Sequence, residues 1–369
     1  MSKVTYLFGA GASYGTRGVL PLDQQPFVSS DDSPAERGIL RGLPILQEFS
    51  SAIDQIIGEL SSFPDSNDDN DFKAELKYII PNVLVELSKV SRDFPTVDTY
   101  AKMLYSTKQS EQYEKFKTQL SLFFIIWQHY HKQDLRYDSF IASLIDAESC
   151  TFPELTILSW NYDLQFEIAY SKYIMENRAL WKIWDMLNVF YKSSNELQSF
   201  NVSAPFAFIK LNGSALFHSR ERDQSTLRFS LQDLLWQSFD ENQFWHEIYS
   251  LLTNGCPKHD YDITKYKNDL SYSWENENAQ HLLTHIEKRV EDCTTLVVIG
   301  YSFPYVNRYI DRHIIGSMPN LSAIHIQDKN PDGIEERIKA IFDYQNRPTP
   351  MISSYAKDLD TFYIPNELG

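Results

Sequence analysis

Residues 4–16 read Val-Thr-Tyr-Leu-Phe-Gly-Ala-Gly-Ala-Ser-Tyr-Gly-Thr, a short β-type run followed by a loop of small residues. Glycines at positions 9 and 11 would let the backbone come close to an anion, and Gly15 lies one turn further on. Their spacing, G-x-G-x-x-x-G, has one residue more before the last glycine than the dinucleotide-binding pattern. The stretch therefore predicts a phosphate-binding loop after a buried strand, with a tight turn that holds no ligand as the alternative.

Four later β-like runs also end in short loops that begin with small or polar residues. They are residues 155–158, 206–211, 296–299 and 323–326, followed by loops at 159–163, 212–214, 300–302 and 327–331. Helical patterns lie between these runs, which is typical of a parallel sheet covered on both faces. Such a sheet binds ligands at the carboxyl ends of its strands, so these loops are expected to meet at one crevice. The sequence predicts an α/β fold, a Rossmann-like parallel sheet with helical insertions.

Several of these loops resemble the motifs of the sirtuin family, in the family's order along the chain. Gly9-Ala10-Gly11-Ala12-Ser13 is similar to its opening motif, and Ser159-Trp160-Asn161-Tyr162-Asp163 is similar to T-x-N-x-D with Ser for Thr. Gly42-Leu43-Pro44 resembles its Gly-Ile-Pro segment, and Gly300-Tyr301-Ser302 resembles its Gly-x-Ser ribose-phosphate loop. Lys210-Leu211-Asn212-Gly213-Ser214 stands where bacterial sirtuin-like NAD hydrolases carry Lys-Leu-His-Gly-Ser, so Asn212 replaces the family's histidine.

The resemblance implies a sirtuin-type NAD-binding domain over residues 1–60 and 151–345. Residues 61–150 are then a helical insertion, within which Pro81 is expected to kink or split a helix over 72–90. Residues 219–290, which carry a stripe of aromatic side chains, are a second insertion, and residues 346–369 form a C-terminal tail. Apolar residues at helical spacing between positions 43 and 60 predict a helix that covers the sheet after the first loop.

The resemblance also assigns the NAD contacts. Gly9, Ala10, Gly11, Ala12 and Ser13 would hold the pyrophosphate, and Gly300 and Ser302 would bind a phosphate or a ribose hydroxyl. Asp328 or Asn330 would meet the adenine ribose, since dinucleotide sites often place an acidic residue beyond a later strand end. The structural alternatives are helix capping for Ser302 and plain loop solvation for Asp328 and Asn330.

Catalytic roles fall to Asn161, Asp163 and Asn212. Asn161 would orient the ribose or a water, and Asp163 would stabilise the ribosyl cation or bind the nicotinamide amide. As alternatives, Asn161 turns the chain and Asp163 caps the following helix. An amide at position 212 cannot take the proton that the family's histidine would accept, so slow turnover is expected. His218, six residues further on, is the alternative base.

The implied function is that of an NAD glycohydrolase, which converts NAD to ADP-ribose and nicotinamide. The bacterial enzymes with these motifs are effectors of antiphage defence that deplete NAD once activated. An unrestrained enzyme would poison its host, so a homo-oligomer or a complex with a separate sensor or activator protein is expected. The rival interpretation is a non-catalytic module that binds NAD or ADP-ribose and regulates a partner.

Composition narrows the class of protein further. The 369 residues are 43% hydrophobic, which is ample for the core of one large domain or of two. The formal net charge of −16, without a basic run, argues against direct nucleic-acid binding. The apolar run at 122–127 is too short to cross a bilayer and no signal peptide is apparent, so a cytoplasmic protein is expected.

No metal is expected from the sequence. Cys150, Cys256 and Cys293 are isolated, so the chain cannot build the four-cysteine zinc site that protein-deacylating sirtuins usually carry. His281 and His285 have the i,i+4 spacing that can hold a metal on a helix, and a solvated helix face is the alternative.

Overall fold

The computed structural model describes residues 3–15, 42–61, 63, 72–131, 133–174, 180–191, 200–219, 241–253 and 266–368. The chain divides into two compact units. The sheet unit consists of Met1–Thr16, Gln133–Ser214 and Leu270–Gly369, and the helical unit consists of Arg17–Lys132 and Ala215–Asp269. Among the described residues, no helix has the length and apolar character that a membrane span needs.

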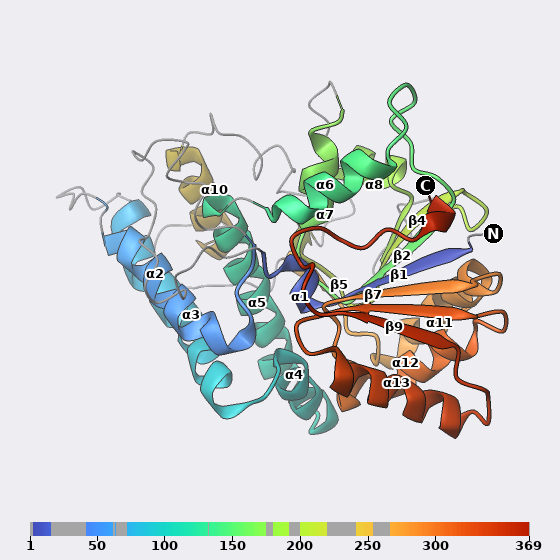
Figure 1. Cartoon of the computed structure of the whole chain (residues 1–369). Coiled ribbons are helices and arrows are strands. Elements are labelled where there is room, and N and C mark those ends of the chain that lie inside the picture. Colours follow the sequence, from blue (N-terminus) through green and yellow to red (C-terminus); the bar gives the residue numbers. More distant parts are fainter. Residues whose placement is uncertain are drawn as a thin grey trace. The chain divides into compact units, whose positions relative to one another are not determined.

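The sheet unit contains a 7-stranded sheet in the order β3-β4-β2-β1-β7-β8-β9 (Figure 1). The strands are β1 (Val4–Phe8), β2 (Leu155–Ser159), β3 (Val189–Tyr191), β4 (Phe206–Lys210), β7 (Thr295–Ile299), β8 (Ala323–Gln327) and β9 (Met351–Tyr355). All neighbouring strands are parallel. Without the edge strand β3, the order follows the 3-2-1-4-5-6 pattern of doubly wound dinucleotide-binding sheets. The predicted α/β fold with a Rossmann-like parallel sheet is confirmed.

Helices cover both faces of this sheet. They are α1 (Ala10–Ser13), α6 (Leu135–Leu144), α7 (Gln165–Ser171), α8 (Leu180–Met186), α11 (Asn276–Val290), α12 (Arg308–Gly316) and α13 (Pro331–Tyr344), with 3-10 turns η5 (Tyr305–Asn307) and η6 (Asn366–Leu368). On one face, α11, α12 and α13 share a core with Leu7 and Val298 of the strands. On the other, the Phe8 ring contacts Tyr137 and Phe140 of α6, with centroids 5.9 and 6.0 Å apart. Successive strand residues point to opposite faces, so β1 is buried along its whole length.

The helical unit holds most of the two predicted insertions. Its elements are η3 (Leu46–Glu48), α2 (Phe49–Ser61), α3 (Phe72–Asp93), α4 (Val97–Ser106), α5 (Ser110–Tyr130), α10 (Glu241–Thr253) and a two-stranded sheet of β5 (Gly213–Ser219), which begins in the sheet unit, and β6 (Tyr266–Leu270). Helix α3 continues through Pro81, so the proline does not split it. The Phe244 ring of the aromatic stripe stacks on His129 at 3.6 Å, so this part of the stripe is packing. Phe229, Trp236 and Phe239 lie outside the described residues.

The boundaries between the units differ from those inferred from the sequence. Helix α2, expected to cover the sheet, belongs to the helical unit, where Ser50 Oγ and Ser88 Oγ of α3 lie 2.9 Å apart. Helix α6, inside the predicted insertion 61–150, and helix α11, inside 219–290, belong instead to the sheet unit. The apolar faces of α6 and α11 pack on the strands. An amphipathic sequence pattern predicts that a helix has an apolar face, but it does not predict which surface that face will pack against.

Residues 346–369 are a part of the sheet unit rather than a tail. Strand β9 pairs in parallel with β8, with Met351 opposite Ala323. Phe362 is 4% exposed, and its ring centroid lies 5.4 Å from that of Phe8. The edge strand is half exposed and follows two prolines, so it lacks the continuous apolar run that marks the central strands.

Candidate functional site

The loops that follow β1 and β7 meet backbone to backbone at the carboxyl edge of the sheet. Gly9 N–H donates to Ile299 O and Gly11 N–H donates to Gly300 O, each at 3.0 Å. A Cβ atom on Gly9 would lie 2.6 Å from Gly300 O, and one on Gly11 would lie 2.7 Å from Gly300 Cα. The glycines are therefore required by the contact between the two loops, whatever a ligand would need.

Gly300 gives a direct test of this contact, because its φ is +59° and a Cβ there would lie 2.4 Å from Gly11 Cα. We expect Gly300→Ala to lower the free energy of unfolding by roughly 2–5 kcal/mol, from left-handed backbone strain plus overpacking. The matched control is Gly333→Ala in α13, where a Cβ meets nothing within 4 Å. That change should stabilise the helix by about 0.5–1 kcal/mol. Similar effects of the two changes in urea unfolding would contradict the close contact.

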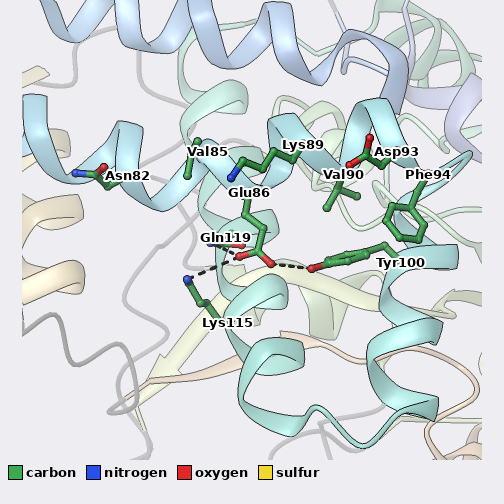
Figure 2. Close-up of a pocket in the computed structure, with 10 residues that line it drawn as sticks. All are labelled: Asn82, Val85, Glu86, Lys89, Val90, Asp93, Phe94, Tyr100, Lys115 and Gln119. Carbon is green, nitrogen blue, oxygen red and sulfur yellow. Dashed lines mark hydrogen bonds and ion pairs between the residues drawn. The ribbon is translucent and has the colours of Figure 1, made fainter.

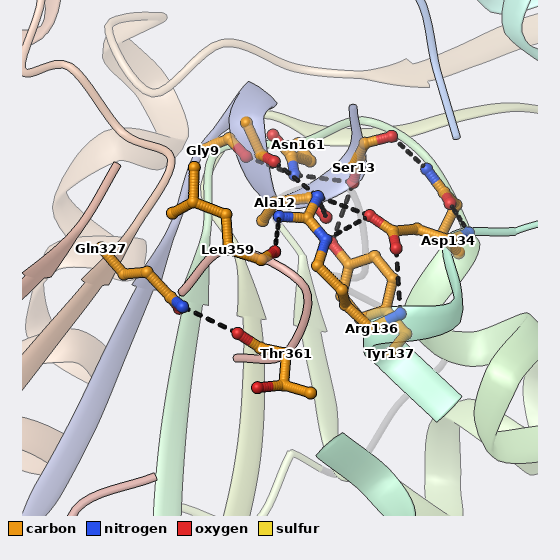
Figure 3. Close-up of polar contacts among 12 residues, drawn as sticks. Gly9, Ala12, Ser13, Asp134, Arg136, Tyr137, Asn161, Gln327, Leu359 and Thr361 are labelled. Atoms are coloured by element: carbon orange, nitrogen blue, oxygen red, sulfur yellow. Dashed lines mark hydrogen bonds and ion pairs between the residues drawn. The ribbon is translucent and has the colours of Figure 1, made fainter. Parts of the chain in front are cut away.

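Side chains hold the carbonyl groups of the first loop (Figure 3). Asn161 Nδ2 donates to Gly9 O at 2.9 Å, and Arg136 Nη2 donates to Gly11 O at 2.8 Å. Ser13 Oγ lies 2.9 Å from both Asn161 Nδ2 and Tyr137 Oη. The acceptor side of the loop is thus occupied by the protein itself, which fixes its backbone before any ligand binds.

Arg136 and Asp134 form a buried ion pair behind this loop. Arg136 Nε donates to Asp134 Oδ2 at 2.8 Å, and Asp134 Oδ1 accepts the Arg136 N–H at the start of α6. Asp134 is fully buried, and the Arg136 guanidinium also lies 5.0 Å from the centroid of the Phe362 ring. Sequence reasoning missed these residues. The only local signal was an aspartate in helix-capping position before an apolar run.

Loss of Arg136 would leave the Asp134 carboxylate buried without its partner. We expect Arg136→Gln to lower the free energy of unfolding by about 3–5 kcal/mol. Lys172→Gln, which breaks the more exposed ion pair with Asp138 (2.8 Å), should cost at most about 1 kcal/mol. Urea titrations of both variants check the difference, and a small effect of Arg136→Gln would mean that Asp134 is not a buried charge.

Asn161 and Asp163 lie where the sequence places them, beside the first loop, and both also have structural roles. Asn161 is 8% exposed, and its amide N–H groups are used by Gly9 and Ser13. Asp163 Oδ1 accepts the Gln165 N–H at 2.9 Å, at the beginning of α7. Burial raises the pKa of Asp163, although the nearby Lys210 opposes the shift. Asp163 therefore has a local structural role next to α7, although the N-cap residue of this helix is Leu164.

Lys210 ties the end of β4 to this region. Its Nζ donates to Asp163 O at 2.6 Å and to Glu167 Oε1 at 2.8 Å, and both charged side chains are buried. Leu211 N–H donates to Ser159 O at 2.8 Å, which continues the strand pairing into the loops. The loops after β2 and β4 are thus adjacent, as the parallel sheet predicts.

Asn212 is fully buried at the end of β4. Its Oδ1 accepts the Ser273 N–H at 3.2 Å, and its carbonyl accepts the Ser271 N–H at 3.0 Å. Within the described part of the chain, its Nδ2 has no hydrogen-bond partner, nor do the buried hydroxyls of Ser214 and Ser273. Buried polar atoms are nearly always paired, so these three atoms are exceptions within the described residues. The side chain of His218 lies outside the described residues.

The remaining predicted contacts have local roles. Ser302 is exposed, and its carbonyl accepts a hydrogen bond from Arg337. Asp328 Oδ1 accepts the Asn330 N–H at 2.8 Å, which closes a turn before α13. Between them in sequence, Lys329 places its Nζ 5.5 Å from the centroid of the Tyr14 ring, so a cation lies beside the first loop.

Tyr301 joins the loops after β2 and β7. Its ring stacks on Trp160 with centroids 5.4 Å apart, and its hydroxyl donates to Asp311 Oδ1 at 2.9 Å. Burial raises the pKa of Asp311 well above its ordinary value, against the smaller effects of Tyr301 and Arg308. The carboxyl group of Asp311 is therefore protonated in the folded protein at pH values where an ordinary aspartate is ionised.

This protonation makes stability depend on pH. We expect the free energy of unfolding to fall as pH rises from about 4 toward the raised pKa of Asp311, because the folded state keeps a proton that the unfolded state has released. Asp311→Asn should remove this contribution, so in urea titrations the stability of the variant relative to the wild type should increase as pH rises above about 4. A difference that does not change with pH would show that Asp311 is ionised when folded.

The histidine pair, the Gly42 segment and Cys256, which the sequence analysis also considered, do not contribute contacts to this crevice among the described residues. His281 Nε2 and His285 Nε2 lie 3.2 Å apart on α11, and burial lowers the pKa of His285. No group of three or more potential metal ligands occurs among the residues that the structure describes. Gly42 lies in the helical unit, where its carbonyl accepts the indole N–H of Trp127 at 3.0 Å. Cys256 is outside the described ranges.

Comparison with known proteins finds structural similarity only, at a low level. No protein-family model matches the sequence, and no curated protein matches it significantly. One solved structure that matches is described as Sir2Tm bound to a propionylated peptide, with a TM-score of 0.35 and 10% sequence identity over 97% of this chain and 88% of that chain. At this TM-score the likeness supports no statement about activity or ligands, and the α/β assignment rests on the strand order given above.

Proposed function

We propose that the sheet unit binds NAD at the carboxyl edge of its sheet and hydrolyses the bond between nicotinamide and ribose. The observation that carries this proposal is the strand order around β1. In sheets of this order a dinucleotide lies across the crevice where the order reverses, here between β1 and β7. The loops at 9–13, 159–163 and 300–302, which carry the sirtuin-like motifs, follow β1 and its two neighbours.

The reaction would break an N-glycosidic bond. A water molecule attacks the anomeric carbon of the nicotinamide ribose, the carbon–nitrogen bond breaks, and its electron pair leaves with nicotinamide. Asn161 would orient the ribose or the water, and the Asp163 carboxyl group would stabilise the cationic ribose. The proton lost by the water needs an acceptor, which Asn212 cannot be. We therefore expect slow turnover.

The resemblance of the motifs supports a biological role for this reaction. We propose a cytoplasmic effector of antiphage defence that depletes NAD when an infection signal or a partner activates it. Restraint in the resting state would come from assembly, either of copies of this chain or with a separate sensor or activator protein.

A nucleotide-binding module without turnover is the second candidate, and particular contacts favour it. Both hydrogen-bonding partners of Asn161 Nδ2 belong to the protein, and Asn212 offers an amide where the hydrolases carry histidine. A site that fixes its loops in this way can bind a dinucleotide and report occupancy without a catalytic base.

The two candidates differ in product formation. The test incubates the full chain with etheno-NAD, alone and with candidate partner proteins, and follows the fluorescence of etheno-ADP-ribose. We expect the fluorescence of etheno-ADP-ribose to increase slowly in the presence of the full chain. Saturable NAD binding without product would select the binding module, and absence of both binding and product would overturn the proposal for this crevice.

A further inference from the structure

A cavity in the helical unit lies apart in sequence from the residues of the NAD proposal. It has a volume of about 420 Å³ and is formed between α3, α4 and α5. This volume falls within the range of small-molecule sites. Figure 2 shows Glu86 of α3 pointing toward Tyr100 and Lys115, with Gln119 beside it.

Glu86 and Gln119 present two hydrogen-bond acceptors at this place. Glu86 Oε1 accepts the Tyr100 hydroxyl at 2.7 Å, and Oε2 accepts Gln119 Nε2 at 3.3 Å. This second bond fixes which end of the Gln119 amide faces Glu86. Gln119 is 1% exposed, and its Oε1 has no hydrogen-bond partner among the described residues. A buried acceptor of this kind needs an N–H or O–H donor.

Burial and Glu86 raise the pKa of the Tyr100 phenol, so Tyr100 remains a donor to Glu86 throughout the physiological pH range. Glu86 Oε1 therefore has Tyr100 as its donor at physiological pH. Lys115 Nζ lies 3.8 Å from the other oxygen, which is too long for a hydrogen bond, and its side chain is 59% exposed. This long ion pair is exposed on the Lys115 side, so Lys115 can also reach a ligand anion.

The other side chains that line the cavity supply charge and apolar surface. Lys89 and Asp93 add one positive and one negative group to those of Lys115 and Glu86, so the lining carries two of each sign. The rings of Phe94 and Tyr100 lie 4.9 Å apart between centroids. A matching ligand has one group of each charge and an apolar part.

We propose that this cavity binds a small zwitterion of the amino-acid type with an apolar side chain. Its ammonium group donates to Glu86 Oε2 and Gln119 Oε1, and its carboxylate lies between Lys89 and Lys115. The apolar side chain packs on Phe94 and Tyr100. This assignment does not depend on the proposed NAD reaction.

The test is isothermal titration calorimetry of the full chain with three probes: L-phenylalanine, N-acetyl-L-phenylalanine and L-phenylalaninamide. The first carries both charges, the second lacks the ammonium group and the third lacks the carboxylate. We expect saturable binding of L-phenylalanine at one site, and binding at least about ten-fold weaker for each derivative. No saturable binding of L-phenylalanine up to its solubility limit, or equal binding of all three probes, overturns the proposal.

Two variants assign the binding to this cavity. Glu86→Gln weakens the acceptor pair, and Lys89→Glu changes an exposed residue, so it should leave the fold unaffected. Both should weaken L-phenylalanine binding by about ten-fold or more. The matched control is Glu75→Gln, which alters another carboxylate of α3 that accepts a tyrosine hydroxyl, from Tyr249 at 2.7 Å, outside the cavity lining. Wild-type affinity in Lys89→Glu, or an equal loss in Glu75→Gln, places the ligand elsewhere and overturns the assignment.

Discussion

Asn212→His is expected to raise the rate of NAD consumption by about 10²- to 10⁴-fold, the usual contribution of a general base. The physical reason is that imidazole, with a pKa of about 6.5, can accept a proton near neutral pH, whereas the amide cannot. The measurement is the rate of NAD loss in the purified variant and the wild type, with any activating partner present. Growth of the host on induction gives a second readout, since a faster enzyme should be toxic.

Two further changes separate base chemistry from packing at this buried position. Asn212→Asp keeps the size of the side chain and the acceptor for Ser273 N–H, and it adds a group that can take a proton. Asn212→Leu has the same number and branching of side-chain heavy atoms and no acceptor, so it should show no gain. If neither Asn212→His nor Asn212→Asp exceeds the wild-type rate, the catalytic role of this position fails and the binding module becomes the better account.

Asn161→Ala is expected to abolish NAD cleavage and to lower the free energy of unfolding by about 1–3 kcal/mol. Stability falls because the substitution removes two hydrogen bonds. Without the Asn161 amide, Gly9 O and Ser13 Oγ each have one donor fewer. The protein should still unfold cooperatively at a lower midpoint, because no core side chain is removed. NAD turnover and thermal unfolding of the same preparation check both parts.

Asn268→Ala is the matched control for this variant. Asn268 Nδ2 also donates to a backbone carbonyl and a serine hydroxyl, Lys117 O at 3.0 Å and Ser121 Oγ at 2.9 Å, but it lies in the helical unit. The two variants should lose similar stability, and Asn268→Ala should keep its NAD turnover. Equal losses of activity would show that Asn161 acts only through stability.

Sequence patterns were sufficient to locate the central strands along the chain. Strands such as Leu155–Ser159 and Thr295–Ile299 are mostly apolar and buried along their whole length, as strands covered on both faces require. Strand β9 was missed because an edge strand is half exposed. The assignment of α2 to a unit failed for another reason, since its apolar face would fit either a sheet or a helix.

The candidate site could be predicted only where the parallel sheet brings loops together. The position of Asn161 beside Gly9 follows from the pairing of β1 with β2, although 152 positions separate the two residues. The contact of Arg136 with Gly11 spans 125 positions and arises from the docking of α6, which no local pattern encodes. Equally, the sequence suggested that Gly9 and Gly11 face an anion, whereas the structure shows that both also contact Gly300.

Hydrogen–deuterium exchange of the full chain with and without NAD tests most directly whether the crevice between β1 and β7 is the binding site. The account predicts that NAD slows exchange in residues 9–14, 159–163 and 300–303, which follow three adjacent strands. Gly300→Ala should remove this protection, while Gly333→Ala should retain it. Protection confined to other segments, or none at saturating NAD, would contradict the account.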